Sequence, residues 1–153
     1  MSDSRFLYVT YMRTSPEKLW EALLKPEFTR QYWFGCSQES DWRKGASWKL
    51  RYPDGTLTDA GEVAEIDPPK KLVLKWRHER LAELKAEGES RASFTLEPMG
   101  EMVKLTVLHE MPRPGSVFIE RVSNGWPSIL SSLKSLLETG QALERPSDIP
   151  KIA

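Results

Sequence analysis

The two histidines, His78 and His109, are the side chains of this chain best suited to proton transfer near neutral pH. Each lies on the apolar face of a stretch in which apolar and polar residues alternate, so both are predicted to point into the interior of a sheet. In a cavity, either could act as a general base. No orienting partner is evident, because Glu110 follows His109 directly and adjacent residues of a strand point to opposite faces. We interpret both as hydrogen-bonded or rim histidines and predict no catalytic residue.

Geometry argues against a metal site formed by this pair. The strand that contains Phe94 is expected to lie between those of His78 and His109, which separates them by two strand spacings, about 9.5 Å. Zinc needs imidazole nitrogens at about 2.1 Å and usually three or four protein ligands. The lone Cys36 cannot form an internal disulfide and is interpreted as a reduced structural thiol. No metal is predicted.

The sequence lacks the common motifs for cofactors and nucleophilic catalysis. It contains no Gly-x-Gly loop, no P-loop, no Gly-x-Ser-x-Gly elbow and no Cys-x-x-Cys pair. No cofactor is therefore predicted, and a non-catalytic role is favoured over an enzymatic one.

Tryptophan is frequent, with six residues in a chain of 153. Four of them occupy pattern positions that face the presumed interior, namely Trp33, Trp48, Trp76 and Trp126. They could form an ordinary core, since a buried aromatic side chain covers roughly 150–250 Å². Alternatively they could line a ligand cavity, in which their indole N–H groups would serve as fixed donors.

Length and charge limit the classes of partner. A chain of 153 residues is long enough for one domain with a sizeable core. Basic and acidic residues balance at 22 each, so nucleic acid and anionic membrane are not expected as main partners. No apolar run approaches the roughly 20 residues that cross a bilayer, and the N-terminal residues lack the apolar stretch of a signal peptide. We expect a cytoplasmic protein.

The elements that position these residues begin with one strand and two short helices. Residues Phe6–Arg13 are rich in aromatic and β-branched side chains and predict a strand. Ser15 followed by Pro16 is typical of a helix start, and Pro26 ends that helix. A second short helix is expected over Glu27–Tyr32.

About five further strands follow in hairpins, which makes about six in all. They are centred on Trp48–Tyr52, Gly61–Ile66, Leu72–His78, Ala92–Leu96 and Val103–His109. The segment Arg80–Glu87 is left open between a short helical turn and an extended hairpin loop.

A long amphipathic helix is predicted from Phe118 to Leu137, with Gly140 placed to end it. Pro127 lacks a backbone donor, so a bend or a restart is expected near Ser123–Trp126. Residues 144–153 have no periodicity and are predicted to be a loose tail after a domain at 6–143.

These elements predict an α+β fold in which a curved antiparallel sheet wraps the last helix. The helix offers the only large apolar surface able to cover the apolar face of the sheet. The twist of the sheet curls it around the helix, and the mismatch between curved sheet and straight helix is expected to enclose an apolar cavity.

Six motifs, in order along roughly residues 6–143, give a resemblance to a known family. They are Ser15-Pro16-Glu17-Lys18-Leu19-Trp20; Trp33-Phe34-Gly35; Tyr52-Pro53-Asp54-Gly55; Gly61-Glu62-Val63; Ile66-Asp67-Pro68-Pro69 with Leu72-Val73-Leu74; and Gly125-Trp126 with Leu130 and Leu133. The chain resembles the homologues of the activator of the ninety-kilodalton heat-shock-protein ATPase, in the START-like (SRPBCC) helix-grip superfamily. The resemblance implies a helix-grip fold, a hydrophobic cavity and, as one option, a chaperone partner.

Three hypotheses of function follow. The favoured one is non-catalytic binding of a small apolar ligand, as a carrier or sensor. The second is a protein-interaction module, such as a chaperone cofactor, suggested by the family resemblance alone. Separately, an uncovered edge strand could pair two copies of the chain into a homodimer. The third is a cyclase-like or hydrolytic enzyme with His78 or His109 as the base. The predicted cavity residues are Trp33, Trp48, Leu74, Trp76, His78, Phe94, Leu105, His109, Phe118, Trp126 and Leu130.

Overall fold

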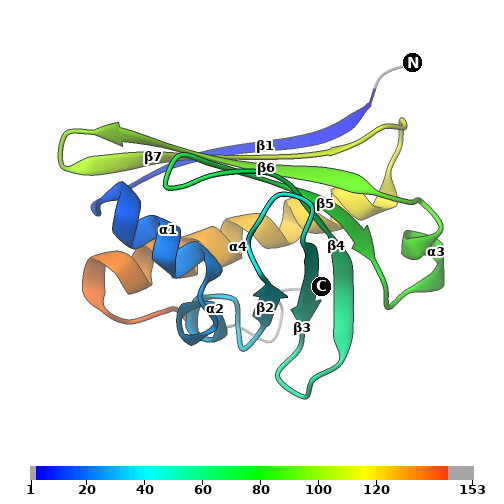
Figure 1. Cartoon of the computed structure of the whole chain (residues 1–153), viewed down its shortest axis with the longest axis horizontal. Coiled ribbons are helices and arrows are strands. Elements are labelled where there is room, and N and C mark those ends of the chain that lie inside the picture. Colours follow the sequence, from blue (N-terminus) through cyan, green and yellow to red (C-terminus); the bar gives the residue numbers. More distant parts are fainter. Residues whose placement is uncertain (1–2, 145–153) are drawn as a thin grey trace.

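A computed structural model describes residues 3–144, which form seven strands and four helices (Figure 1). In chain order the elements are β1 (Ser4–Met12), α1 (Pro16–Leu24), α2 (Pro26–Tyr32), β2 (Ser37–Ser40), β3 (Ser47–Arg51), β4 (Leu57–Asp67), β5 (Lys71–His78), α3 (Ala82–Lys85), β6 (Ser90–Met99), β7 (Met102–Met111) and α4 (Val117–Thr139). The segment left open between a helical turn and a loop contains the short helix α3. The predicted tail lies, apart from residue 144, outside the described residues.

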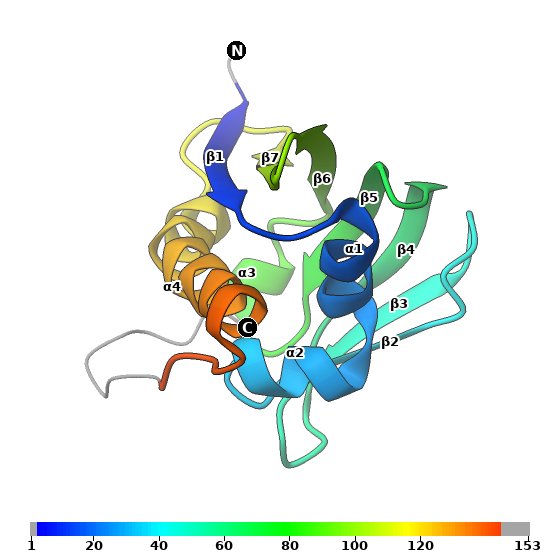
Figure 2. The ribbon, with the colours of Figure 1, turned by 90° about the vertical axis from the view of Figure 1, so that its left-hand side faces the viewer.

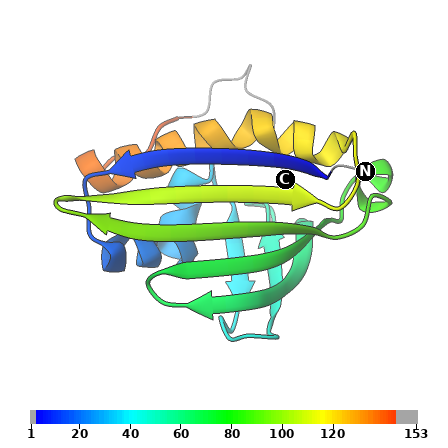
Figure 3. The same cartoon turned by 90° about the horizontal axis from the view of Figure 1, so that it is seen from above.

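All seven strands form one antiparallel sheet in the order β1-β7-β6-β5-β4-β3-β2. The sheet curves around α4, and α1 and α2 occupy the open side of the curve beside that helix (Figure 2). Seen from above, β1, β7 and β6 run side by side over the length of α4 (Figure 3). The predicted fold class is confirmed, with one strand more than the six expected.

Local sequence sets the helix ends as predicted. Ser15 Oγ accepts a hydrogen bond from the backbone N–H of Lys18 at 3.2 Å, and Pro16 opens α1. Gly140 ends α4 with φ 85°, a left-handed conformation that glycine adopts without a steric penalty.

Helix α4 runs through Pro127 without interruption, so the expected restart is not observed. Buried side chains lie on both sides of the proline, including Val122 and Trp126 before it and Ile129 and Leu130 after it. Because this face is buried from Phe118 to Leu133, packing outweighs the loss of one backbone hydrogen bond.

The curvature of the sheet depends on irregular positions in β4. The β3–β4 register shifts between Leu50 and Arg51, and the β4–β5 register shifts between Val63 and Glu65. A Cβ added to Gly61 would lie 1.7 Å from the carbonyl oxygen of Lys75, so the two backbones approach more closely than a side chain allows. Bulges and such close approaches bend a sheet.

A single core lies between the sheet and α4, and α1 and α2 close its open side. Its largest fully buried side chains include Trp48, Trp76, Trp126, Tyr32 and Phe118. Among the helices of residues 3–144, none is long and apolar enough to cross a membrane.

Candidate functional site

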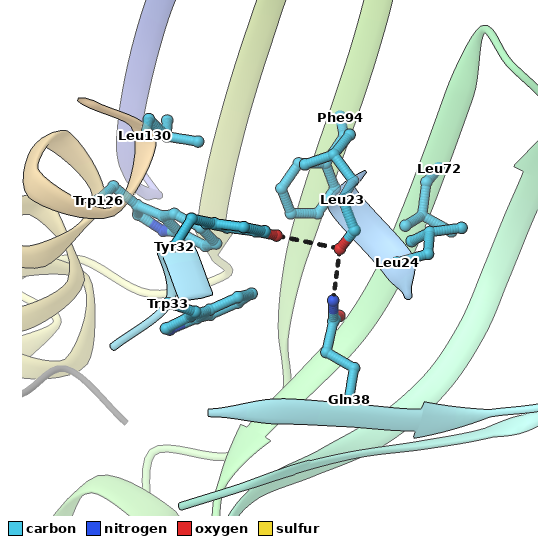
Figure 4. A pocket seen from close by; sticks show the side chains of 9 residues that line it. All are labelled: Leu23, Leu24, Tyr32, Trp33, Gln38, Leu72, Phe94, Trp126 and Leu130. Atoms are coloured by element: carbon cyan, nitrogen blue, oxygen red, sulfur yellow. Dashed lines mark hydrogen bonds between the residues drawn. The ribbon is translucent and has the colours of Figure 1, made fainter. Parts of the chain in front are cut away.

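A void lies in the interior, but it is smaller than the ligand cavity that the sequence predicts. It has room for about 10 Å³, close to the minimum volume that holds one water molecule. Figure 4 shows the side chains that surround it. It is lined by Leu23, Leu24, Tyr32, Trp33, Gln38, Leu72, Phe94, Trp126 and Leu130. A cavity large enough for a small molecule is therefore not observed among the described residues, because Trp126 and Leu130 pack into the interior with only 1% of their surface exposed.

Four of the eleven predicted cavity residues line this void, namely Trp33, Phe94, Trp126 and Leu130. The other seven are buried around it as core, namely Trp48, Leu74, Trp76, His78, Leu105, His109 and Phe118. Sequence analysis did not identify the five lining residues that α1, α2, β2 and β5 contribute, namely Leu23, Leu24, Tyr32, Gln38 and Leu72. The apolar periodicity of α1 places Leu23 and Leu24 on its buried face, and it was the signal that could have identified these two as lining residues.

The four inward-facing tryptophans fill the space that a ligand would need. The ring centroids of Trp48 and Trp76 lie 4.4 Å apart, and those of Trp33 and Trp126 lie 5.4 Å apart. Trp76 joins the two pairs, at 6.1 Å from Trp33 and 5.7 Å from Trp126. These tilted and edge-on contacts are favourable for aromatic rings, so the cluster is an energetically stable filling of the interior.

His109 belongs to a fully satisfied chain of hydrogen bonds. The indole Nε1 of Trp126 can only donate, so its 3.2 Å contact makes His109 Nδ1 the acceptor. His109 Nε2 then carries the proton and donates to Ser90 Oγ at 2.8 Å. Ser90 in turn donates to the Trp76 carbonyl at 2.9 Å. Burial lowers the pKa of His109 to about 3. With both nitrogens engaged and the ring neutral, His109 is not placed to accept a proton from a substrate.

His78 has a different environment, beside a buried carboxylate. Its Nδ1 lies 3.3 Å from Asp59 Oδ2, and both side chains are at most 1% exposed. The same Asp59 oxygen accepts a hydrogen bond from Trp76 Nε1 at 2.6 Å. Asp59 and His78 are opposite each other in the β4–β5 ladder, so the pairing of this hairpin brings them together. The sequence analysis did not find Asp59, because its proximity to His78 follows from the register of the β4–β5 pairing. The sequence pattern alone does not fix that register.

Three side chains that are connected through Trp76 have buried polar atoms without a hydrogen-bond partner among residues 3–144. These atoms are Trp33 Nε1, Asp59 Oδ1 and both ring nitrogens of His78, whose contact with Asp59 is not aligned as a hydrogen bond. An unsatisfied buried polar group costs about 1–3 kcal/mol. We call Trp33, Asp59 and His78 the buried polar cluster. Trp76 links them, since its ring packs near Trp33 and its N–H binds Asp59.

Chemically, this cluster could bind a polar group of a ligand through one indole donor, one carboxylate oxygen and one imidazole. A carboxylate beside an imidazole can also orient a general base, although here a substrate would first have to reach the interior. No group of three or more His, Cys, Asp or Glu side chains within the described chain is arranged to hold a metal ion.

The chain folds as a helix-grip domain of the START-like class. Its curved antiparallel sheet wraps one long helix, and a small void and buried polar atoms lie between them. The model of the family described as activator of Hsp90 ATPase homolog 1-like protein matches residues 13–138. The chain belongs to this family.

Solved structures with the same fold come from several organisms. Protein MLL2253 of Mesorhizobium loti is 22% identical with a TM-score of 0.75, covering 88% of this chain and 97% of that one. The Aha1 dimer of Colwellia psychrerythraea is 20% identical with a TM-score of 0.72, covering 91% and 99%. PFC0360w, an HSP90 activator of Plasmodium falciparum, is 23% identical with a TM-score of 0.70, covering 87% and 95%. No curated protein matches the chain. At these identities the likeness establishes the fold alone.

Proposed function

We propose that the protein binds, without transforming it, a small and largely apolar molecule that carries one polar group. The observation that carries this proposal is the buried polar cluster beside an apolar void. Trp33 belongs to the cluster and also lines the void, so one ligand could contact both. The apolar part of the ligand would pack against the side chains that line the void. Its polar group would form hydrogen bonds with the buried polar atoms that otherwise lack a partner, which is unfavourable for them.

Binding must enlarge the interior, because a void of about 10 Å³ does not hold such a molecule. The elements best placed to move are α1, α2 and β2. The carbonyl of Leu23 at the end of α1 accepts hydrogen bonds from Tyr32 Oη at 3.0 Å and from Gln38 Nε2 at 2.7 Å. These bonds join the three elements, so we expect them to shift together. The loop after α2 contains Phe34 with φ 50°, a strained conformation for a bulky residue and a candidate hinge.

The test combines native mass spectrometry with titration of fatty acids, aromatic alcohols and polycyclic ketones. A ligand of this class should bind with a dissociation constant that His78→Gln raises at least tenfold. The matched control is His109→Gln, a second buried histidine outside the buried polar cluster, which should change affinity less than threefold. Absence of binding by folded protein, or a crystal structure in which water alone satisfies Trp33, Asp59 and His78, would rule the proposal out.

A second candidate is a protein-interaction module, and exposed apolar residues on β1 favour it. Leu7, Val9 and Tyr11 on the outer face of this edge strand are 60%, 42% and 42% exposed. Exposed apolar edge strands are natural sites for pairing with another chain. Family membership makes a second copy or a chaperone the partners to test. Two experiments distinguish these partners. Light scattering compares the native chain with Val9→Lys, and a dimer that dissociates in the variant supports self-association. An ATPase assay on added Hsp90 tests the second partner, and stimulation of the ATPase supports a chaperone role.

A further inference from the structure

The two tryptophans outside the core line a groove on the molecular surface. Trp20 lies on α1 and Trp42 lies in the segment between β2 and β3. Together with Leu24, Pro26, Ile66 and Pro68 they line a groove of about 420 Å³. This volume falls within the roughly 300–1,000 Å³ range of sites for small molecules.

Both indoles are partly buried and pack against the core, but they lack the polar and aromatic contacts of the core tryptophans. Trp48, Trp76 and Trp126 each donate a hydrogen bond from Nε1, and all three contact other aromatic rings. Within the described chain, the rings of Trp20 and Trp42 contact no other aromatic ring, and their Nε1 atoms have no hydrogen-bond partner. Both residues line the groove, and neither indole N–H is engaged by another described residue.

The position of Trp42 is held at an energetic cost. Its backbone has φ 52°, a left-handed conformation that is unfavourable for a residue with a side chain. Its N–H donates to Ser40 Oγ at 3.0 Å, which fixes the local turn. Strained backbone of this kind concentrates at binding sites. Pro26 and Pro68, whose rings fix their backbone φ angles, also belong to the lining of the groove.

Charge at the groove restricts the ligand further. The only charged residues among its lining are Glu21 and Lys25, which form an ion pair with each other at 2.6 Å. This pair leaves no net charge to attract an ionic group. We propose that the groove, through Trp20 and Trp42, binds a small neutral aromatic molecule with a hydrogen-bond acceptor. This site is separate from the buried polar cluster and does not depend on the proposed interior site.

Indole N–H signals in a ¹H–¹⁵N correlation spectrum test the proposal residue by residue. The probes are N-phenyl-1-naphthylamine, a neutral dye that fluoresces in apolar sites, and 2-acetylnaphthalene, a neutral aromatic ketone. Each should shift the Trp20 and Trp42 signals saturably while leaving those of Trp33 and Trp76 unchanged. Shifts confined to Trp33 and Trp76 would place the probes in the interior and overturn the proposal, as would the absence of saturable shifts.

Variants give a second readout. Trp42→Ala should weaken binding of 2-acetylnaphthalene at least tenfold, and Trp20→Phe at least threefold, since phenylalanine keeps a ring but lacks the donor. Tyr11→Ala removes a 42% exposed aromatic ring from β1 and is the matched control, with an expected change below twofold. Circular dichroism checks that each variant is folded. Equal effects of Trp42→Ala and Tyr11→Ala would contradict the assignment.

Discussion

At the scale of single residues, the two histidines have opposite roles although both are buried. His109 is held neutral by a chain of bonds from Trp126 to Ser90, and every polar atom in that chain has a partner. His78 lies beside Asp59, and neither of its ring nitrogens has a hydrogen-bond partner among the described residues. A satisfied histidine stabilises the core, whereas an unsatisfied one is retained at a cost that ligand binding could offset.

The low pKa of His109 predicts a specific loss of stability in acid. Its pKa is about 3 in the folded protein, owing to burial, and near 6.5 when unfolded. Between these values the unfolded chain binds the additional proton, so the free energy of unfolding falls as the pH is lowered from 6.5 toward 3. The slope from this group approaches about 1.4 kcal/mol per pH unit. Above pH 6.5 it contributes no pH dependence.

His109→Gln isolates this effect, because the carboxylates titrate similarly in both proteins. At pH 7 the variant should be less stable by about 1–3 kcal/mol, since glutamine does not reproduce both hydrogen bonds. Urea unfolding at pH 7, 6, 5 and 4.5 should show the gap to the native protein narrowing by about 1 kcal/mol per unit below pH 6. A gap that stays constant with pH would show that His109 is not buried as a neutral ring.

How far sequence predicts this site depends on the kind of residue. The inward orientation of His78 and His109 followed from strand alternation and is confirmed by exposures of 1% and 0%. The partner Asp59 and the void-lining Gln38 could not be found in this way, because polar residues carry no apolar periodicity. Their burial depends on hydrogen bonds to residues distant in sequence, such as Gln38 Oε1 accepting from Trp48 Nε1 at 2.9 Å.

At the scale of elements, the close backbone approach at Gly61 lets β4 and β5 curve together. Gly61→Ala would place a methyl group 1.7 Å from the Lys75 carbonyl oxygen, which belongs to backbone and cannot rotate away. We expect a loss of about 3 kcal/mol, the upper part of the range for overpacking. Ala60→Gly, on the same strand, should cost about 1 kcal/mol or less. Thermal and urea unfolding measure both, and similar losses would argue against a steric role for this position.

The start of α4 is fixed by a carboxylate from another element. Glu87, in the segment between α3 and β6, accepts hydrogen bonds from Ser116 Oγ at 2.5 Å and from Val117 N–H at 2.9 Å. A negative charge at a helix N-terminus is favourable, and caps contribute about 0.5–2 kcal/mol. Glu87→Gln should therefore lower the free energy of unfolding by about 1 kcal/mol. The neighbouring exposed Glu89, changed to Gln, should have little effect, and equal effects would remove Glu87 from this role.

Prediction of the elements succeeded where packing and local signals agree. Helix α1 has a serine cap, an N-terminal proline and an apolar stripe, all of which indicate the same boundaries. Strand β2 was missed because Ser37–Ser40 contains no apolar residue, and its pairing with β3 defines it. Of the two alternatives expected at Pro127, a bend or a restart, the restart is not observed, because local propensity gave no measure of the burial on either side of the proline.

At the scale of the whole molecule, the two spaces described above share one lining side chain. Leu24, at the end of α1, lines both the interior void and the surface groove, and it is 7% exposed. Its neighbour Leu23, which is 5% exposed, lines the void but is absent from the groove lining. The surface and the interior are therefore divided at the junction of α1 and α2, the region that we expect to move when the interior opens.

This arrangement predicts different results for two similar substitutions. Leu24→Ala and Leu23→Ala should each cost about 2–5 kcal/mol, as expected for leucine truncation in a core. Only Leu24→Ala joins the groove to the void, so only in this variant should N-phenyl-1-naphthylamine shift the indole signal of Trp33 as well as those of Trp20 and Trp42. In Leu23→Ala the void is larger but stays closed, and the Trp33 signal should not move. If the Trp33 signal responds equally in both variants, Leu24 does not separate the two spaces.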